Sequence, residues 1–464
     1  MSMTLSRRRF LRWAGVGVAT AVLPQRLLAA QADRKPNILF ILIDDMGWSD
    51  LPCYGNRFHE TPQIDRLVEQ GMRFTDAYAA CPVCSPTRAS ILSGQYPARV
   101  GVIDFIPGHW RPYEKLRVPS NRTQYLPQQI VTIAESLKSA GYVTGHVGKW
   151  HLGGGKHAPD KQGFDLAKQR GRNRGDKQVT AFTDAAIEFI EENRDRPFFL
   201  HLSHRSVHIP LEAPSELVEK YENKPKPTTG VNNPTYAAMI EHLDQNVGGL
   251  LGRLDELNLS DDTIVIFYSD NGGLRQRFTG SDEIVTTNDP LRDEKGTVYE
   301  GGIRVPLIVR WPGVVEPGTL CRTPVSSVDF YPTFLEVAKG SKPQGQVLDG
   351  RSLMPLWRQR SGFPDRTLYW HYPVYHHSRP AGAIRQGDWK LIEFFDDDSL
   401  ELYNLREGIR EQNNLAASHP EKASQLQRTL AAWRESVNAA MPKPNPDFDP
   451  SRRHEWGRHP DRGG

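Results

Sequence analysis

Oxygen-bearing residues come after apolar stretches at two points of the sequence. Asp44 and Asp45 follow the apolar stretch 37–43, and Asp270 and Asn271 follow a later one. Adjacent carboxylates repel each other, and a bound cation relieves that repulsion. Carboxylate and amide oxygens are the ligands that Ca²⁺ and Mg²⁺ prefer in proteins. Each pair alone could be a helix cap or a solvated loop, but the two pairs together favour a cation site.

Lysine and histidine residues flank further apolar stretches. Lys149 and His151 follow one stretch, His204 and His208 follow another, and Lys295 precedes a third. Ligands of open α/β sheets bind at the carboxyl ends of the strands, so these side chains are expected around one site. Near pH 7 an imidazole can accept or donate a proton, whereas an ammonium group stabilises an anion. A lone histidine is more often structural, and His204 is expected to be so.

The segment 84–94 predicts a thiol at the start of a helix. Pro86 is typical of a first helical turn, which places Cys84 where backbone amides and the helix dipole favour an anion. Arg88 adds a fork of donors that suits an oxyanion. Cys81 and Cys84 could instead form a redox pair, but the surrounding sequence lacks the thioredoxin-like context of such pairs.

An α/β sheet is needed to bring these residues together. Apolar stretches without alternation are typical of buried strands, and helical patterns lie between them. The expected strands are 37–43, 142–147, 198–203, 263–268 and 305–310, and the expected helices are 63–70, 132–140, 180–193 and 236–257. The sequence therefore predicts a large mixed, mostly parallel sheet flanked by helices, within a catalytic domain over 33–355.

The pattern changes after about residue 350. Short strands with turn signals predict a small antiparallel sheet, and a last helix is expected to pack on it. The strands are expected near 367–370, 383–385, 389–394 and 400–403, and the helix over 421–438. These elements predict a small α+β subdomain over 356–441. The Pro- and Arg-rich segment 442–464 is expected to be a loose tail.

The first 32 residues predict export. They hold five arginines and no acid, with Arg7, Arg8 and Arg9 in a row before the apolar run 13–23 and small residues near position 32. This layout resembles a twin-arginine signal peptide. The alternative is a membrane anchor, but the run is shorter than the roughly 20 residues that span a bilayer. The mature protein is therefore expected in the bacterial periplasm, with the twin-arginine export machinery as a partner.

Charge and cysteine content exclude several classes of protein. The formal charge is +3, and removal of the five arginines of residues 1–32 leaves 53 basic against 55 acidic residues. No basic stripe with interleaved aromatic residues indicates nucleic-acid binding. Four cysteines are too few for a disulfide framework and lack the paired spacing of a zinc site. No role is assigned to Cys53, Cys81 or Cys321.

Two segments of the chain resemble the signatures of the type I, formylglycine-dependent sulfatases. They are the segment 84–94, which begins Cys-Ser-Pro-Thr-Arg, and the segment 141–153, which contains Gly-Lys-Trp-His-Leu-Gly. Segments 206–210, 269–273 and 295–302 match further blocks of the family, and the resemblance extends from residue 36 to about 415. It implies the fold of the alkaline-phosphatase superfamily, as in exported bacterial arylsulfatases and carbohydrate sulfatases.

The resemblance also implies a mechanism. In this family a maturation enzyme oxidises the signature cysteine, here Cys84, to Cα-formylglycine. The hydrated aldehyde attacks sulfur, the substrate alcohol leaves, and the sulfate is then expelled. One Ca²⁺ is implied, with Asp44, Asp45, Asp270, Asn271 and the modified Cys84 as ligands. For the other positions it implies that Arg88 orients the nucleophile, Lys149 and Lys295 bind sulfate, His151 is the base and His208 the acid.

The substrate is expected to be a sulfated small molecule or glycan. Segments 370–373 and 375–377 are rich in aromatic residues and histidines, which could stack on sugar rings, or could form a packed hairpin instead. Alternative functions are a phosphomonoester or phosphonate-ester hydrolase on the same scaffold and a non-catalytic sulfated-glycan binder. Asp293 and Glu294 stand where many relatives carry small residues. Both are expected to point outward or to pair with arginines.

Overall fold

The computed structural model describes residues 35–457, apart from 109, 120–122 and 277–282. The predicted signal peptide, 1–32, lies outside the described residues, so export stays a prediction. Within the described part of the chain, no helix is both long and apolar enough to cross a membrane.

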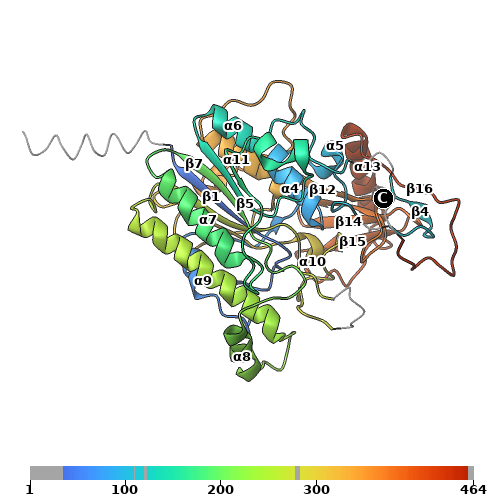
Figure 1. Ribbon diagram of the computed structural model, residues 1–464. Coiled ribbons are helices and arrows are strands. Elements are labelled where there is room, and N and C mark those ends of the chain that lie inside the picture. Colours follow the sequence, from blue (N-terminus) through green and yellow to red (C-terminus); the bar gives the residue numbers. More distant parts are fainter. Residues whose placement is uncertain (1–34, 109, 120–122, 277–282, 458–464) are drawn as a thin grey trace, which may run out of the picture.

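An eight-stranded sheet with the order β10-β2-β9-β8-β1-β7-β5-β6 forms the centre of the large domain (Figure 1). Its strands are β1 (Asn37–Ile43), β2 (Met72–Phe74), β5 (Val143–Gly148), β6 (Leu166–Lys168), β7 (Phe198–Ser203), β8 (Thr263–Ser269), β9 (Leu307–Arg310) and β10 (Thr319–Cys321). Every neighbouring pair is parallel except those of β9, which runs antiparallel to β8 and β2. The predicted mixed, mostly parallel sheet is confirmed.

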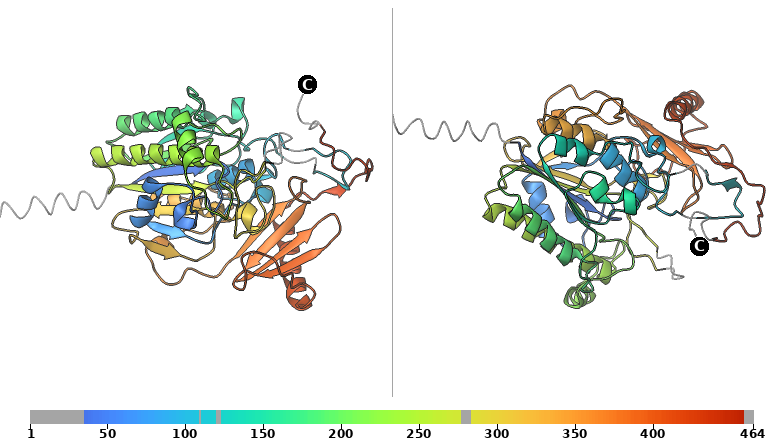
Figure 2. Two further views of the ribbon diagram at one scale, coloured as in Figure 1. Left: turned by 90° about the horizontal axis from the view of Figure 1, so that it is seen from below. Right: turned by 45° about the horizontal axis from the view of Figure 1, so that its top comes forward.

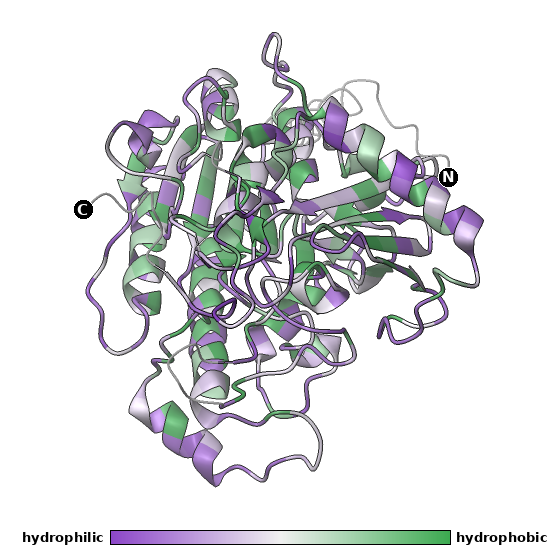
Figure 3. Ribbon diagram, turned by 90° about the vertical axis from the view of Figure 1, so that its right-hand side faces the viewer, coloured by the Kyte–Doolittle hydropathy of each residue, from purple (hydrophilic) through white to green (hydrophobic). Residues whose placement is uncertain are grey.

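Strand β1 shows why apolar and polar residues do not alternate in the stretches that form the central strands. Ile38, Phe40 and Leu42 pack on one face of the sheet against α4 (Cys84–Ser93), α6 (Ile133–Ser139) and α11 (Phe330–Val337). Leu39 and Ile41 pack on the other face against α3 (Pro62–Glu69), α7 (Val179–Glu192) and α9 (Pro234–Glu256). Both faces of the strand are therefore buried, as expected for a central parallel strand. Figure 3 shows bands of hydrophobic and hydrophilic residues along the outer helices.

Helices and strands of the large domain broadly alternate along the chain. The α-helices are α3 (Pro62–Glu69), α4 (Cys84–Ser93), α5 (Pro97–Val100), α6 (Ile133–Ser139), α7 (Val179–Glu192), α8 (Ser215–Asn223), α9 (Pro234–Glu256), α10 (Glu300–Ile303), α11 (Phe330–Val337) and α12 (Met354–Trp357). Short 3₁₀ turns lie at Pro52–Tyr54, Gly155–His157, Pro159–Lys161 and Ser327–Asp329, and the two-residue strands β3 (Ala77–Tyr78) and β11 (Val325–Ser326) pair with each other.

The C-terminal part is a separate antiparallel sheet covered by a helix (Figure 2). Strands β12 (Thr367–Tyr372), β13 (Ala381–Gln386), β14 (Trp389–Phe394) and β15 (Leu400–Asn404) pair in chain order, and α13 (Pro420–Ser436) follows. Leu426 and Leu430 of α13 pack on Ile384, Leu391 and Leu402 of the sheet. The predicted strands and helix are present.

The tail differs from the prediction, because its described residues are held against the large domain. Strand β16 (Lys443–Pro444) pairs with β4 (Leu116–Arg117). The Asn445 side-chain amide donates to the carbonyls of Pro112 and Glu114 at 2.7 and 2.8 Å. All of these contacts are hydrogen bonds to the backbone of a distant segment, and no periodicity in the sequence predicts them.

A buried ion cluster joins the C-terminal sheet to the large domain. Lys390 Nζ on β14 lies 2.9 Å from a carboxylate oxygen of Glu300 on α10 and 2.8 Å from one of Glu411. All three side chains have 0% exposure. Burial alone would raise the pKa of Glu300, but Lys390 and two arginines outweigh it and lower that pKa to about 2. Burial raises the pKa of Glu411 to about 7.

Glu411→Gln should flatten the dependence of stability on pH. The folded protein holds the Glu411 proton more tightly than the unfolded chain, whose glutamate pKa is about 4.3. The stability that Glu411 contributes is therefore complete below about pH 4 and is lost as the pH rises through 7. Thermal unfolding midpoints between pH 5 and 8 measure this slope. Glu407→Gln, at an exposed position, is the control, and an unchanged slope in Glu411→Gln would contradict the assignment.

Candidate active site

The carboxyl ends of β1, β5, β7 and β8 meet at one edge of the sheet and carry most of the predicted site residues. Asp44 follows β1, Lys149 follows β5, and Asp270 follows β8. Strand β9 runs the opposite way, so the segment before it, with Lys295, reaches the same edge. The contacts below bring all ten predicted residues together at this edge.

Cys84 is the first residue of α4 and is 1% exposed. Every residue of α4 is buried, so the helix is fixed inside the large domain. The Cys84 Sγ atom lies 3.2 Å from His151 Nδ1. The unsatisfied amides of the first helical turn surround this position, as the sequence predicted, and favour a bound anion.

Arg88 lies one turn into α4 and connects three strand ends. Its Nε and one Nη donate to a single oxygen of Asp270 at 2.9 and 2.7 Å. Its other Nη donates to the Lys149 carbonyl at 2.7 Å and to Ser203 Oγ at 2.5 Å. Burial opposes the charge of Arg88, but Asp270 and Asp44 outweigh it and raise the arginine pKa. Arg88 is therefore a fixed cation.

The predicted cation ligands converge around Cys84. Ligand atoms of Asp44, Cys84 and Asp270 lie within 4.8 Å of one another. Asn271 donates through Nδ2 to Asp45 at 2.8 Å, while its Oδ1 is buried and accepts no hydrogen bond within the described residues. A buried amide oxygen without a donor is costly unless a cation or water meets it. The donor set of carboxylate and amide oxygens fits a hard cation such as Ca²⁺.

Two lysines neutralise the adjacent aspartates. Lys149 Nζ lies 2.9 and 2.7 Å from the two oxygens of Asp44, and Lys295 Nζ lies 2.7 and 2.8 Å from those of Asp45. Burial acts to lower both lysine pKa values, but the carboxylates outweigh it and raise them. Both ammonium groups are charged and lie where they can also attract the oxygens of an anionic substrate.

His151 presents an unprotonated nitrogen to Cys84. Its Nε2 lies 2.6 Å from the Ile106 carbonyl, which can only accept a hydrogen bond, so Nε2 carries the proton and Nδ1 faces Sγ with its lone pair. Burial and the neighbouring Lys149 lower the His151 pKa to about 3. A neutral imidazole in this position can accept a proton from a group at residue 84.

His208 faces the other side of the site. Its Nδ1 lies 2.6 Å from the Ile209 carbonyl, and its Nε2 lies 3.6 Å from Asp45. The His208 side chain is 31% exposed, whereas those of the neighbouring lysines, Lys149 and Lys295, are 11% and 7% exposed. Its exposure places Nε2 where a leaving group would reach solvent.

A pocket of about 240 Å³ opens onto Cys84. Its lining residues are Cys84, Phe105, His151, His208, Ile209, Leu274, Lys295 and His376. Phe105, Ile209 and Leu274 form apolar walls; Ile209 belongs to the matched segment 206–210, whereas no motif in the sequence marked Phe105 or Leu274. His376 comes from the loop between β12 and β13, so the C-terminal subdomain contributes to the pocket wall.

The aromatic hairpin of the C-terminal subdomain is mostly packed, which favours the packed-hairpin alternative for segments 370–373 and 375–377. Trp370 and Tyr372 are each 1% exposed, Trp370 donates to the Ala79 carbonyl, and Tyr372 donates to Asp104. Only His376 of this hairpin reaches the pocket. A Cβ on Gly296 would lie 2.0 Å from its Nδ1, which explains a glycine directly after Lys295.

Three further residues complete the comparison with the sequence-based prediction. Glu294 is buried and accepts the backbone N–H of Arg275 at 2.6 Å, so it does not point outward. Asp293 is half-buried, and neither acid lines the pocket. His204 is fully buried beside Phe182 and outside the pocket, as expected for a structural histidine.

Comparisons with known proteins agree with this geometry. Residues 36–341 match the family described as Sulfatase, and residues 293–436 match the one described as N-sulphoglucosamine sulphohydrolase, C-terminal. The chain is 34% identical to a sulfatase of Formosa agariphila over 88% of this chain and 90% of that one. It is 32% identical to human arylsulfatase A, with 81% and 79% covered. The crystal structure of Ps i-CgsB in complex with k-i-k-neocarrahexaose superposes with a TM-score of 0.73 at 28% identity, covering 89% and 95%.

Proposed function

This chain belongs to the sulfatase family and is a sulfuric ester hydrolase, and from that premise we propose that it removes sulfate from a carbohydrate. One observation carries the catalytic part of the proposal: Cys84 starts α4 with a neutral His151 nitrogen 3.2 Å from its side chain. The carbohydrate part is supported by two similarities. The C-terminal region matches a sulphoglucosamine sulphohydrolase family, and a similar solved structure holds a neocarrahexaose.

We propose that a maturation enzyme oxidises Cys84 to Cα-formylglycine. The hydrate of that aldehyde supplies an oxygen nucleophile at the start of α4. His151 Nδ1 takes up a proton at this position, and its Nε2–H remains bound to the Ile106 carbonyl. His208 holds a proton on Nδ1 toward the Ile209 carbonyl, so it must first take up a second proton at Nε2, on the solvent side, before it can deliver one to the leaving alcohol. The amides of α4 and the buried Arg88 attract the sulfate and hold its reacting face toward residue 84.

The cation site would hold one Ca²⁺. Its ligands would be Asp44, Asp45, Asp270, Asn271 and the modified residue 84. A bound Ca²⁺ supplies Lewis-acid polarisation of a sulfate oxygen. Lys149 and Lys295 keep the carboxylates from repelling one another, and their charge attracts the ester into the pocket.

Removal of the metal should lower both stability and activity. A chelator should lower the thermal unfolding midpoint, and Ca²⁺ at about 100 times its Kd should restore about 2.7 kcal/mol of stability. Asp45→Asn should lose most of this Ca²⁺-dependent shift, because a carboxylate ligand becomes an amide. Asp261→Asn, at an exposed position, should keep it. If the thermal unfolding midpoint of the unsubstituted protein did not depend on the Ca²⁺ concentration, the proposed metal site would be contradicted.

A substrate panel tests the reaction. Sulfated mono- and oligosaccharides, an aryl sulfate and the phosphate ester of the same aryl alcohol are compared by kcat/KM. We expect a sulfated sugar to be the best substrate and the phosphate ester to be poor. Turnover of the aryl sulfate without hydrolysis of any sugar sulfate would overturn the carbohydrate assignment. Preference for the phosphate ester would favour a phosphomonoester or phosphonate-ester hydrolase, and glycan binding without turnover would favour a non-catalytic binder.

We also propose that the protein acts outside the cytoplasm. The paired arginines and apolar run of residues 1–32 support export by a twin-arginine route. Cell fractionation of the natural host, with N-terminal sequencing of the mature chain, tests this. A chain that retains residues 1–32 in the cytoplasmic fraction would contradict it.

A further inference from the structure

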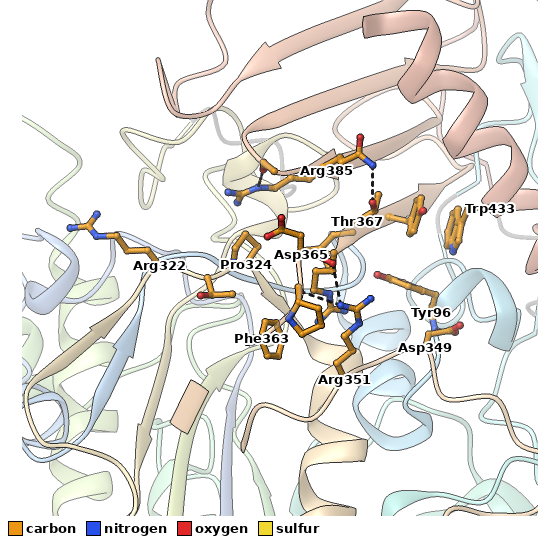
Figure 4. Close-up of a pocket in the computed structure, with 17 residues that line it drawn as sticks. Tyr96, Arg322, Pro324, Asp349, Arg351, Phe363, Asp365, Thr367, Arg385 and Trp433 are labelled. Carbon is orange, nitrogen blue, oxygen red and sulfur yellow. Dashed lines mark hydrogen bonds between the residues drawn. The ribbon is translucent and has the colours of Figure 1, made fainter. Parts of the chain in front are cut away.

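A second and larger cleft lies where the C-terminal subdomain meets the large domain (Figure 4). It has a volume of about 920 Å³, against about 240 Å³ for the pocket at Cys84, and the two share no lining residue. Helix α4 begins at Cys84, and Tyr96, three residues after its last residue Ser93, lines the cleft. A ten-residue helix spans about 15 Å, so the cleft is remote from the reacting group.

Four arginines from different segments line this cleft, and two of them are neutralised. Arg366 lies 2.6 Å from the buried Asp329, and Arg385 lies 2.9 Å from Asp76. Because these acids hold both guanidinium groups in ion pairs, Arg366 and Arg385 contribute to the shape of the cleft but leave no uncompensated positive charge for a ligand. The other two arginines, Arg322 and Arg351, are exposed.

The guanidinium groups of Arg322 and Arg351 have no acidic partner among the described residues. The guanidinium group of Arg351 donates to the backbone carbonyls of Pro364 and Asp365, at 3.1 and 3.2 Å. The two acids that line the cleft differ: Asp349 is held by Arg99 at 2.8 Å, while Asp365 is exposed. The cleft thus offers two uncompensated guanidinium groups against one uncompensated carboxylate. That balance suits a ligand with an anionic group.

Aromatic side chains form the opposite wall. Tyr369 and Trp433 stack with ring centroids 4.7 Å apart and planes 2° apart, and Tyr96 meets both edge-on. Tyr96 is 5% exposed, and its hydroxyl points into the cleft in Figure 4, where the Arg366 side chain also contacts it. A phenol hydroxyl that accepts a hydrogen bond can still donate one, so an oxygen of a ligand in the cleft could bind it.

We propose that this cleft binds a sulfated segment of a glycan, away from the ester that is being cleaved. Separate sulfate groups would meet Arg322 and Arg351, a ring hydroxyl would meet Tyr96, and the half-buried Tyr369 and Phe363 would border the sugar rings. The identity of the ligand rests on the proposed function. The cleft would hold a second segment of the polymer whose ester lies at Cys84, and would so raise the affinity for polymers but not for small esters.

Kinetics on two substrates test the cleft. Arg322→Ala/Arg351→Ala should raise KM for a sulfated polysaccharide about ten-fold, since two charge-assisted contacts are lost, and leave its kcat unchanged. The kcat/KM for an aryl sulfate should stay within two-fold of the unsubstituted protein. Arg358→Ala/Arg360→Ala removes two exposed arginines outside the cleft and should change neither substrate.

Native electrophoresis in gels with sulfated or desulfated polysaccharide tests binding without turnover. The unsubstituted protein should be retarded only by the sulfated polymer, and Arg322→Ala/Arg351→Ala should lose that retardation. Equal losses on both substrates, an unchanged KM for the polymer, or retardation by the desulfated polymer would overturn the proposal. Relief of retardation by millimolar inorganic sulfate alone would show a simple anion site instead. If no sulfate ester is hydrolysed, the proposed function fails, while the gels still decide whether the cleft binds.

Discussion

Cys84→Ala should lower the turnover of an aryl sulfate at least about a thousand-fold and leave the fold intact. Under the proposed mechanism the substitution removes the only source of the nucleophile, and loss of a covalent nucleophile is among the largest single-residue effects in hydrolases. The remaining cations, Arg88, Lys149 and Lys295, would still attract the ester. KM should therefore change far less than kcat.

Cys81→Ala is the matched control for this experiment. Cys81 is as buried as Cys84 and stands three residues earlier, but it does not line the pocket, and burial raises its pKa well above the usual range for a thiol. Its substitution should keep kcat within a few-fold. Comparable turnover by Cys84→Ala and Cys81→Ala would contradict the nucleophile assignment.

Mass spectrometry tests whether Cys84 is converted to formylglycine, which is a separate question from whether residue 84 is the nucleophile. The peptide around Cys84, taken from active enzyme of the natural host, should have the mass expected for formylglycine, not that of a thiol. An unmodified thiol in fully active enzyme would overturn the maturation step even if Cys84→Ala were inactive. The two measurements together therefore distinguish a thiol mechanism from an aldehyde mechanism.

The proximity of the site residues at the strand ends was predictable, because a parallel sheet places the carboxyl ends of its strands at one edge. Once 37–43 and 263–268 are adjacent parallel strands, Asp45 and Asn271 must lie at the same edge, and they are hydrogen bonded at 2.8 Å. The direction of β9 was not predictable. A short apolar strand has the same sequence pattern in either direction, and only its pairing with β8 and β2 decides.

Residues that act through tertiary packing were harder to predict. Trp370 and Tyr372 alternate along β12 and face the interior, whereas His376 lies beyond the strand and reaches the pocket. The amino-acid composition of the segment could not separate these three residues, because it does not show which side of the hairpin packs inward and which side faces the pocket. Phe105 is a similar case, since its place beside His376 depends on contacts between segments far apart in the chain.

Lys390→Met should destabilise the protein by about 3–5 kcal/mol, the usual cost of leaving a buried charge without its partner. The substitution leaves the carboxylates of Glu300 and Glu411 buried, with Glu411 also accepting the backbone N–H of Glu300 at 2.7 Å. Methionine replaces most of the aliphatic stem, so the effect reports the lost charge more than lost packing. Urea unfolding measures it, and Lys342→Met, at an exposed position, should be nearly neutral.

The dependence of this loss on pH distinguishes charge from packing. Without Lys390, Glu411 can stay buried only when protonated, so the destabilisation should be larger at pH 8 than at pH 6. Lys390→Met/Glu411→Gln should recover part of the stability at pH 8, because one uncompensated carboxylate is gone. Equal losses at both pH values, with no recovery in the double variant, would show that Lys390 acts through packing alone.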